Sequence, residues 1–261
     1  MNPRKDHRHH CLAYAAQGQG EPLVLVHGYL GSNRMWGEQI EHFSKDFDVI
    51  APDLAGFGAS ADRPAPDSIA GHAQLLLDLL DELQVDRFHL LGHSMGGMIV
   101  QQMAAMAPER IIRLVLYGTG PKGVLPDRFE TIEASRQRLQ REGLAATGRR
   151  IAATWFMAGQ DAPAFNLCMQ AGAKASMQAA LASLTAWEHW TGTPLLEKLN
   201  MPTLVVWGDH DKSYGWQQPE ALWRGISHAN LAVVPGCAHN VHLEKPLIFN
   251  AIVEDFLHGN S

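Results

Sequence analysis

Short runs of apolar residues recur along the chain, and within each run the apolar residues do not alternate with polar ones. Continuous runs rich in Val, Leu and Ile are typical of strands buried on both faces, whereas a sheet with one exposed face gives alternation. The pattern therefore predicts a mainly parallel sheet covered by helices on both sides. The runs lie at 23–26, 47–51, 88–91, 114–117, 204–207 and 231–234.

Two of the segments between these runs are expected to be helices. The first begins at Asp67 or Ser68, either of which can cap it. Its apolar residues recur at intervals of four and three, which places them on one stripe: Ile69, Ala73, Leu76, Leu80 and Leu83. The second covers 95–107 and stops at Pro108. A strand, a helix and a strand in this order predict right-handed parallel crossovers.

The alternation of strands and helices stops in the middle of the chain. Between 121 and about 196 the sequence is rich in Met, Ala, Gln and Trp, and the strand pattern resumes only at 201–207. We interpret 121–196 as an inserted helical cap, and 1–120 together with 197–261 as one core domain. A chain of 261 residues is long enough for one large core with such an insertion.

Charge and cysteine usage limit the partners that the chain is expected to have. A net charge of -6, without a basic stripe, argues against nucleic acid, because phosphate binding needs a basic face. The basic, histidine-rich stretch 4–10 is predicted to be a solvated tail rather than an anion or metal site. Cys11, Cys168 and Cys237 form no disulfide pattern. With no apolar segment typical of export or membrane insertion, we expect a cytoplasmic protein without a membrane partner.

A candidate nucleophile follows the run at 88–91. The residues Gly92 to Gly96 read Gly-x-Ser-x-Gly, directly after a predicted buried strand and before a predicted helix. On such a sharp turn the serine backbone is strained, and the residues two before and two after it come so close that only glycine fits. The turn raises the Ser94 hydroxyl above the carboxyl edge of the sheet, near a helix N-terminus that favours a developing anion.

A serine hydroxyl needs a base within hydrogen-bond reach and an acid that orients the base. His239 is the predicted base because it lies in a loop just past the last apolar run, and His242 is the alternative. Asp211 is the predicted acid because Gly-x-x-Asp completes a turn after a buried strand. Asp209 is the alternative acid, although its side chain is equally suited to bracing its own turn.

Acyl transfer also requires N–H donors aimed at the oxyanion of the tetrahedral intermediate. The backbone N–H groups of Tyr29, after a strand exit, and of Met95, after the nucleophile, are predicted to form this oxyanion hole. Apolar side chains of the cap are expected to face the substrate, because a lid excludes water with apolar surface. The predicted pocket residues are Tyr29, His93, Trp155, Trp187 and Trp190.

With these motifs the chain resembles the α/β-hydrolase superfamily over nearly its whole length. The resemblance rests on 27–29, 53–60, 92–97, 208–211, and 239 with 243–246, in that order along the chain. The order Ser94, Asp211, His239 is also the one expected of this superfamily. The resemblance implies an α/β fold with a mostly parallel eight-stranded sheet, a helical lid, and hydrolysis through an acyl-enzyme with no cofactor and no metal.

The leading hypothesis is a serine hydrolase that cleaves a small to medium, partly apolar carboxylic ester or lactone. In this respect the chain looks most like small capped esterases and 3-oxoadipate enol-lactonase-like enzymes. A carbon–carbon bond hydrolase of aromatic ring-cleavage products is the first alternative, although that group usually has Asn at the position of His93. A weakly catalytic, ligand-binding member of the superfamily is the second. In each case the partner is a small molecule, and the chain is expected to be a monomer or homodimer.

Overall fold

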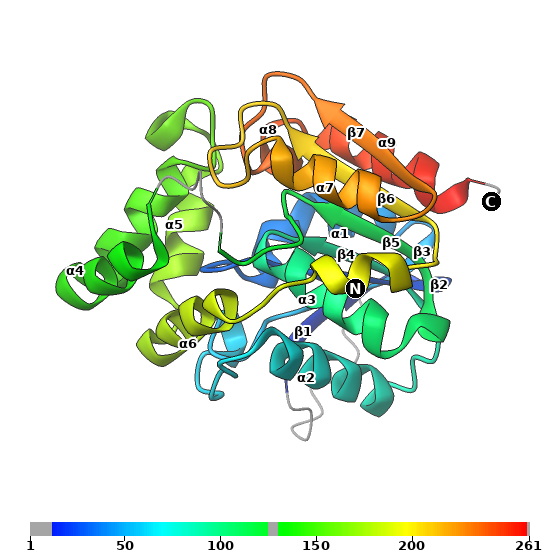
Figure 1. The fold of residues 1–261 in the computed structure, drawn as a ribbon, viewed down its shortest axis with the longest axis horizontal. Helices are drawn as coiled ribbons and strands as arrows, with labels where there is room; N and C mark the ends of the chain where they lie inside the picture. The colour runs from blue at the N-terminus through cyan, green and yellow to red at the C-terminus, as the bar shows by residue number, and fades with distance from the viewer. Residues whose placement is uncertain (1–11, 125–129, 260–261) are drawn as a thin grey trace.

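The computed structural model describes residues 12–124 and 130–259, so the stretch 4–10 and Cys11 lie outside the described residues. A seven-stranded sheet runs through the molecule, with helices on both of its faces (Figure 1). The strand order is β1-β3-β2-β4-β5-β6-β7. Pairing is parallel from β3 to β7, and β1 is antiparallel to β3. The strands are β1 Tyr14–Gln17, β2 Glu21–Val26, β3 Phe47–Pro52, β4 Phe88–His93, β5 Ile111–Tyr117, β6 Thr203–Gly208 and β7 Ala229–Val234.

Each apolar run predicted as a strand lies within one of the strands β2 to β7, so the mainly parallel sheet is confirmed. The expected number of eight strands is wrong by one over residues 12–124 and 130–259. The seventh strand, β1, is a short and partly exposed edge strand that no apolar run marks. The chain leaves β1 through Gly18 and Gly20, both at positive φ, and enters β2 at once, so no residues remain between them for another strand.

The continuous apolar runs are explained by a core on each face of the sheet. Leu91 and Val206 point to the face covered by α1 and α9, while their neighbours Leu90 and Val205 belong to the core on the opposite face. The edge strand β7 departs from this pattern, because Val233 is 43% exposed. The covering helices are α1 Gly37–Phe43 and α9 Pro246–His258 on one face, and α2 Ile69–Glu82, α3 Met95–Met106 and α7 Gln217–Gly225 on the other.

The predicted helix boundaries agree closely with the structure. The Ser68 hydroxyl accepts a hydrogen bond of 3.2 Å from the backbone N–H of Gly71 and so caps α2. The second predicted helix corresponds to α3, which ends at Met106, just before a short 3₁₀ turn that begins with Pro108. This places Ser94 between the end of β4 and the start of α3.

Between β5 and β6, the described residues form three α-helices that group at one end of the sheet (Figure 1). They are α4 Ile132–Ala153, α5 Phe165–Ala173 and α6 Met177–Glu188. α4 packs against α5 and α6, and its helical geometry is broken at Gly143, where φ is 79°. This helical segment falls within the predicted insertion, and the domain boundaries at 121 and 196 stay a prediction.

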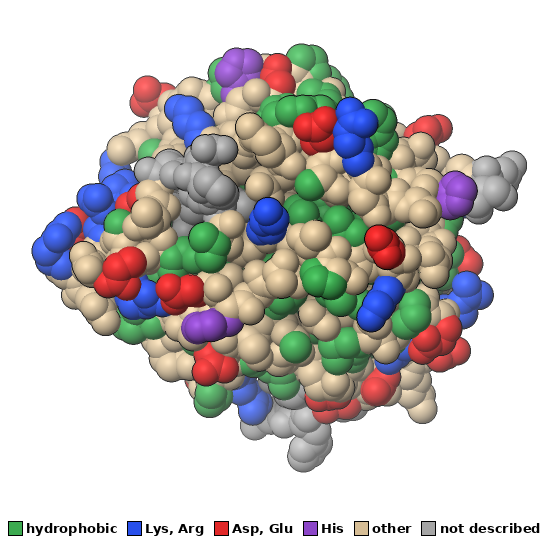
Figure 2. Space-filling model, viewed as in Figure 1, with side chains coloured by type: hydrophobic (Ala, Val, Ile, Leu, Met, Phe, Trp, Pro, Cys, Tyr) green, Lys and Arg blue, Asp and Glu red, His purple; other side chains and the backbone are tan. Residues whose placement is uncertain are grey.

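None of the helices in the described ranges combines the length and the hydropathy that a membrane span needs. On the face shown in Figure 2, acidic and basic side chains are intermixed, and both kinds gather over α4. Several of them are paired on α4 itself, for example Arg136 with Glu133 and Arg141 with Glu142. Such exposed pairs contribute little to stability, because solvent and salt screen them.

Candidate active site

The turn between β4 and α3 has the strained geometry that its sequence predicts. Ser94 has a φ of 57° and a ψ of -120°, a conformation that costs about 1–3 kcal/mol for a residue with a side chain. A Cβ atom on Gly92 would lie 2.4 Å from the carbonyl oxygen of Gly96. A Cβ atom on Gly96 would lie 2.3 Å from the carbonyl oxygen of Val26. Both glycines are therefore required by close backbone contacts around the serine.

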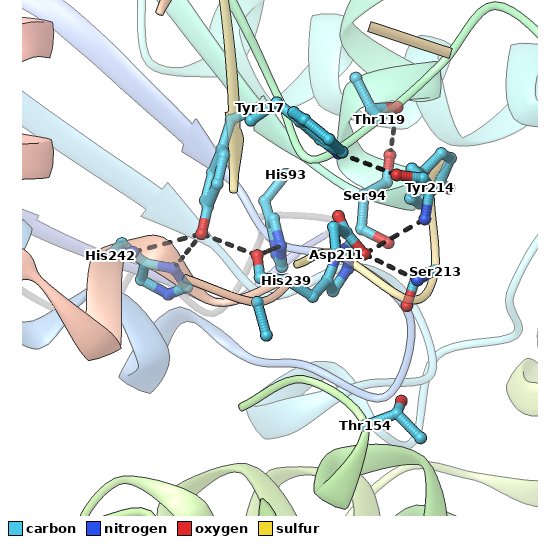
Figure 3. Close-up of polar contacts among 12 residues, drawn as sticks. His93, Ser94, Tyr117, Thr119, Thr154, Asp211, Ser213, Tyr214, His239 and His242 are labelled. Carbon is cyan, nitrogen blue, oxygen red and sulfur yellow. Dashed lines mark hydrogen bonds and ion pairs between the residues drawn. The ribbon is translucent and has the colours of Figure 1, made fainter. Parts of the chain in front are cut away.

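Hydrogen bonds from the neighbouring strand hold this turn in place. The backbone N–H of Ser94 donates to the carbonyl oxygen of Tyr117 over 3.0 Å, at the end of β5. The Thr119 hydroxyl donates to the Ser94 carbonyl oxygen over 2.8 Å (Figure 3). Gly97 leaves room for this threonine, because a Cβ at that position would lie 2.5 Å from the Thr119 side chain. The strained backbone of Ser94 is thus fixed by contacts on both sides.

His239 and Asp211 come from separate loops at the carboxyl edge of the sheet and meet there. His239 Nδ1 lies 2.8 Å from Asp211 Oδ2, and the two side chains are 1% and 0% exposed (Figure 3). The other carboxylate oxygen, Oδ1, accepts hydrogen bonds from the backbone N–H groups of Ser213 and Tyr214 at 2.7 and 3.1 Å. The N–H of Asp211 donates to the carbonyl oxygen of Gly208, which closes the turn expected from Gly-x-x-Asp.

The two alternative residues lie elsewhere. Asp209 contacts His210 Nδ1 at 2.7 Å and the backbone N–H of Cys237 at 3.3 Å, and its side chain is 31% exposed. His242 is buried beneath the loop, where its ring packs 4.6 Å from Trp36. Burial lowers the pKa of His242 to about 3, so its ring is neutral at physiological pH. The structure therefore brings Asp211, and not Asp209, into contact with His239.

The loop after β2 lies directly against Ser94. A Cβ on Gly28 would be 2.8 Å from the Cβ of Ser94, so this position also requires glycine. Tyr29 follows Gly28, and Met95 follows Ser94 as the first residue of α3, where the helix leaves backbone N–H groups without a partner of its own. Of the two residues predicted to form the oxyanion hole, Met95 therefore follows the nucleophile in sequence, and Tyr29 belongs to the loop that packs against it.

The side chain of His27 holds this loop in place through hydrogen bonds, a role that the sequence did not reveal. The backbone N–H of Leu54 donates to His27 Nε2 over 3.0 Å, so Nε2 carries no proton. The proton is on Nδ1, which donates to the carbonyl oxygen of Gly28 over 2.8 Å. Burial lowers the pKa of His27 and keeps this ring neutral, despite the opposing effect of Asp53.

A narrow cavity of about 30 Å³ reaches Ser94 and His239. Among the predicted pocket residues, Tyr29, Trp155 and Trp187 line it. His93 and Trp190 are not among its lining residues: the His93 ring packs beneath the His239 loop, and Trp190 Nε1 donates to Gln102. Four lining side chains were not predicted from the sequence, because no local motif marks them: Met98, Ile151, Ser213 and Tyr214.

Aromatic rings pack around the imidazole of His239. Tyr214 stacks on His239 with ring centroids 5.7 Å apart and an interplanar angle of 12°, and Trp155 lies 6.2 Å away. Tyr29 and Trp187 meet edge to face at 4.7 Å, which joins the loop after β2 to α6. The lining residues that the structure describes include no Asp, Glu, Lys or Arg.

A possible metal-binding group lies far from this site. Within 12–124 and 130–259, the atoms of Asp46, Glu254 and His258 that could bind an ion lie within 4.8 Å of one another. Asp46 precedes β3, so this group is at the opposite edge of the sheet from Ser94. Exposed acidic groups of this kind are common without an ion, and we assign no role to it.

Comparison with known proteins gives consistent results. A family model described as the alpha/beta hydrolase fold matches residues 21–160 and 170–246. The chain is 29% identical over 249 residues to 3-oxoadipate enol-lactonase 2 of Acinetobacter baylyi, covering 94% of this chain and 92% of that protein. The structure of a thermophilic esterase from Thermogutta terrifontis is 29% identical with a TM-score of 0.85, covering 94% and 92%. A hydrolase from Pseudomonas aeruginosa is 28% identical with a TM-score of 0.86, covering 95% and 94%.

Proposed function

Because this chain belongs to the alpha/beta hydrolase fold family and is a hydrolase, we propose that it cleaves carboxylic esters or lactones with Ser94, His239 and Asp211. The observation that carries the proposal is the buried 2.8 Å contact between His239 and Asp211, next to a cavity that both Ser94 and His239 line. Similarity to an enol-lactonase and an esterase supports the same class of reaction.

The proposed reaction has two steps. Ser94 Oγ attacks the substrate carbonyl carbon while its proton passes to His239 Nε2, and a tetrahedral oxyanion forms. The N–H groups of Tyr29 and Met95 donate to this oxyanion. His239 then protonates the leaving oxygen, the carbon–oxygen bond breaks, and an acyl-enzyme remains. In the second step His239 takes a proton from water, which attacks the acyl-enzyme, and the proton returns to Ser94 as the acid leaves.

Asp211 determines which nitrogen of His239 can act as the base. A carboxylate 2.8 Å from Nδ1 accepts a hydrogen bond, so the neutral ring carries its proton on Nδ1 and leaves Nε2 free to receive the serine proton. The carboxylate is itself fixed by the N–H groups of Ser213 and Tyr214. The same negative charge stabilises the imidazolium that forms during the reaction.

The cavity is suited to bind uncharged substrates with a short acyl group. Its described lining offers no cation to pair with a carboxylate, and its walls are largely aromatic and aliphatic. Moving an unpaired carboxylate from water into such surroundings costs several kcal/mol. The volume of about 30 Å³ leaves little room beside Ser94 unless the insertion moves. We therefore propose neutral esters and lactones with small acyl groups as the substrate class.

A panel of aryl esters and lactones of increasing acyl length tests the proposal, with the Ser94→Ala variant as the blank. We expect the highest kcat/KM for short, neutral acyl groups. The matched pair is the 4-nitrophenyl ester of monomethyl succinate against the 4-nitrophenyl ester of succinate with its free carboxylate. The neutral ester should be preferred by at least about 100-fold, which corresponds to roughly 2.7 kcal/mol.

The outcomes test the proposed nucleophile and the proposed substrate class separately. If Ser94→Ala retains more than a few per cent of wild-type turnover, the proposed nucleophile is wrong. If wild type cleaves both succinate esters equally well, the nucleophile stands and the uncharged substrate class is wrong. Two further measurements cover the alternatives: a vinylogous diketone from ring cleavage tests carbon–carbon bond hydrolysis, and failure of a fluorophosphonate to label Ser94 would indicate a ligand-binding protein.

A further inference from the structure

Tyr117, the last residue of β5, lies beneath the loop that carries His239 and is fully buried. Its hydroxyl donates to the carbonyl oxygen of His239 over 2.9 Å. The Tyr117 hydroxyl oxygen also accepts from the backbone N–H of His242 over 3.2 Å and lies 3.1 Å from His242 Nδ1 (Figure 3). The Tyr117 backbone carbonyl oxygen accepts from the Ser94 N–H, but its side chain does not line the cavity, and its hydroxyl acts on the site through His239.

His93 supplies a second contact to the same carbonyl group. Its Nε2 lies 3.2 Å from the His239 carbonyl oxygen, and its ring stacks on Tyr117 with centroids 4.5 Å apart. A carbonyl oxygen only accepts hydrogen bonds, so His93 Nε2 must carry a proton. Burial holds the pKa of His93 well below its usual range, which makes this a neutral ring with its one proton on Nε2.

The proton positions around Tyr117 follow from the same reasoning. Its single hydroxyl proton is donated to His239, because a carbonyl oxygen has no proton to give. The His242 backbone N–H can only donate, and His242 Nδ1 must then also donate to the Tyr117 oxygen. Burial raises the pKa of Tyr117 well above its usual range, so the hydroxyl stays protonated. One proton and two acceptor positions of this hydroxyl are therefore all in use.

These contacts hold one end of a single peptide plane. The plane contains the His239 carbonyl group and the N–H of Asn240, which donates to the carbonyl oxygen of Trp155 over 3.0 Å. Tyr117 and His93 thus hold the carbonyl end from the core, while Trp155 holds the N–H end from the insertion. If the carbonyl end were released, the plane could rotate and tilt the His239 ring relative to Asp211.

We propose that Tyr117 is a positioning residue for His239 and that His93 shares this role through the same carbonyl oxygen. The proposal rests on the proposed function of His239 as the base. The positioning role is tested with different residues from the proposed function, since Tyr117 and His93 do not line the cavity. Because a displacement of about 1 Å at the reacting groups can cost about 100-fold in rate, loss of the tyrosine hydroxyl should be measurable in turnover.

The first variant is Tyr117→Phe, which keeps the ring and removes the hydroxyl. We expect kcat for a neutral aryl ester to fall about 10- to 100-fold with KM unchanged, because the cavity lining stays intact. His93→Leu removes the second donor and should lower kcat in the same way. His93→Gln, whose side-chain N–H can reach the same carbonyl oxygen, should retain most of the wild-type kcat.

A matched control separates positioning from general loss of stability. Phe88→Leu shortens a buried side chain at the opposite end of β4 from Ser94, so it should lower the melting temperature and leave kcat unchanged. All variants are assayed below their melting temperatures. If folded Tyr117→Phe and folded His93→Leu both keep kcat within twofold of wild type while Ser94→Ala and His239→Ala are inactive, the positioning role is wrong and the proposed function stands.

Discussion

The Asp211→Asn variant is the sharpest test of the proposed chemistry, because the structure determines how the new amide must lie. Oδ1 of Asp211 accepts hydrogen bonds from the N–H groups of Ser213 and Tyr214. Those donors need an oxygen, so the amide oxygen of Asn must take the Oδ1 position. The NH₂ group then faces His239 Nδ1, where the carboxylate oxygen Oδ2 lay at 2.8 Å.

This orientation forces His239 into the wrong tautomer. An NH₂ group donates, so Nδ1 must become the acceptor and the proton of the neutral ring moves to Nε2. Nε2 can then no longer receive the proton of Ser94. The corresponding change in serine proteases lowers kcat by about 10⁴, or roughly 5.4 kcal/mol of transition-state stabilisation. We expect a loss of that order here, because both side chains are buried and water cannot replace the lost acceptor.

The assay compares kcat and the melting temperature of Asp211→Asn and Asp209→Asn with wild type. Asp209 is partly exposed and bonds only within its own turn and the neighbouring loop. Asp209→Asn should therefore remain active and lose about 1 kcal/mol of stability. A folded Asp211→Asn enzyme with more than a tenth of wild-type kcat would refute the tautomer argument, whatever the stability data show.

Three further predictions concern other parts of the molecule. His239→Ala should lower kcat as far as Ser94→Ala, since Ser94, His239 and Asp211 are proposed to act as a unit. His242→Ala should keep most of the activity. If measured kcat values show the reverse, His242 and not His239 is the base. Gly28→Ala places a Cβ 2.8 Å from the Cβ of Ser94 and should lower kcat/KM by about tenfold or more, and wild-type kinetics would contradict this placement. Burial lowers the pKa of His72 from 6.5 to about 4. Between pH 6.5 and 4 the unfolded chain therefore binds a proton at His72 that the folded chain does not, so the free energy of unfolding falls as the pH drops through this range. His72→Leu should flatten this dependence in thermal melts, and an unchanged slope would count against it.

The sequence by itself determined the architecture and the position of the nucleophile. The strands β2 to β7 were predictable because a strand covered on both faces needs apolar residues at consecutive positions. The turn at Ser94 was predictable because the close approach of Gly92 to Gly96 excludes every side chain, a requirement that is written in the local sequence. The partly exposed edge strand β1 carried no such pattern, and the expected number of eight strands came from the resemblance and not from the apolar runs.

Only the tertiary structure decided between residues that lie close together in the chain. Asp209 and Asp211 occupy the same loop, and the sequence favours one only through an expected turn. Which carboxylate meets His239 depends on how two loops separated by 28 positions approach each other. Tyr214 and Tyr117 carry no motif, and they reach His239 because the ends of parallel strands and the loops that follow them converge at one edge of the sheet. Local sequence patterns encode backbone shape, whereas contacts between side chains distant in sequence depend on the packing of the whole sheet.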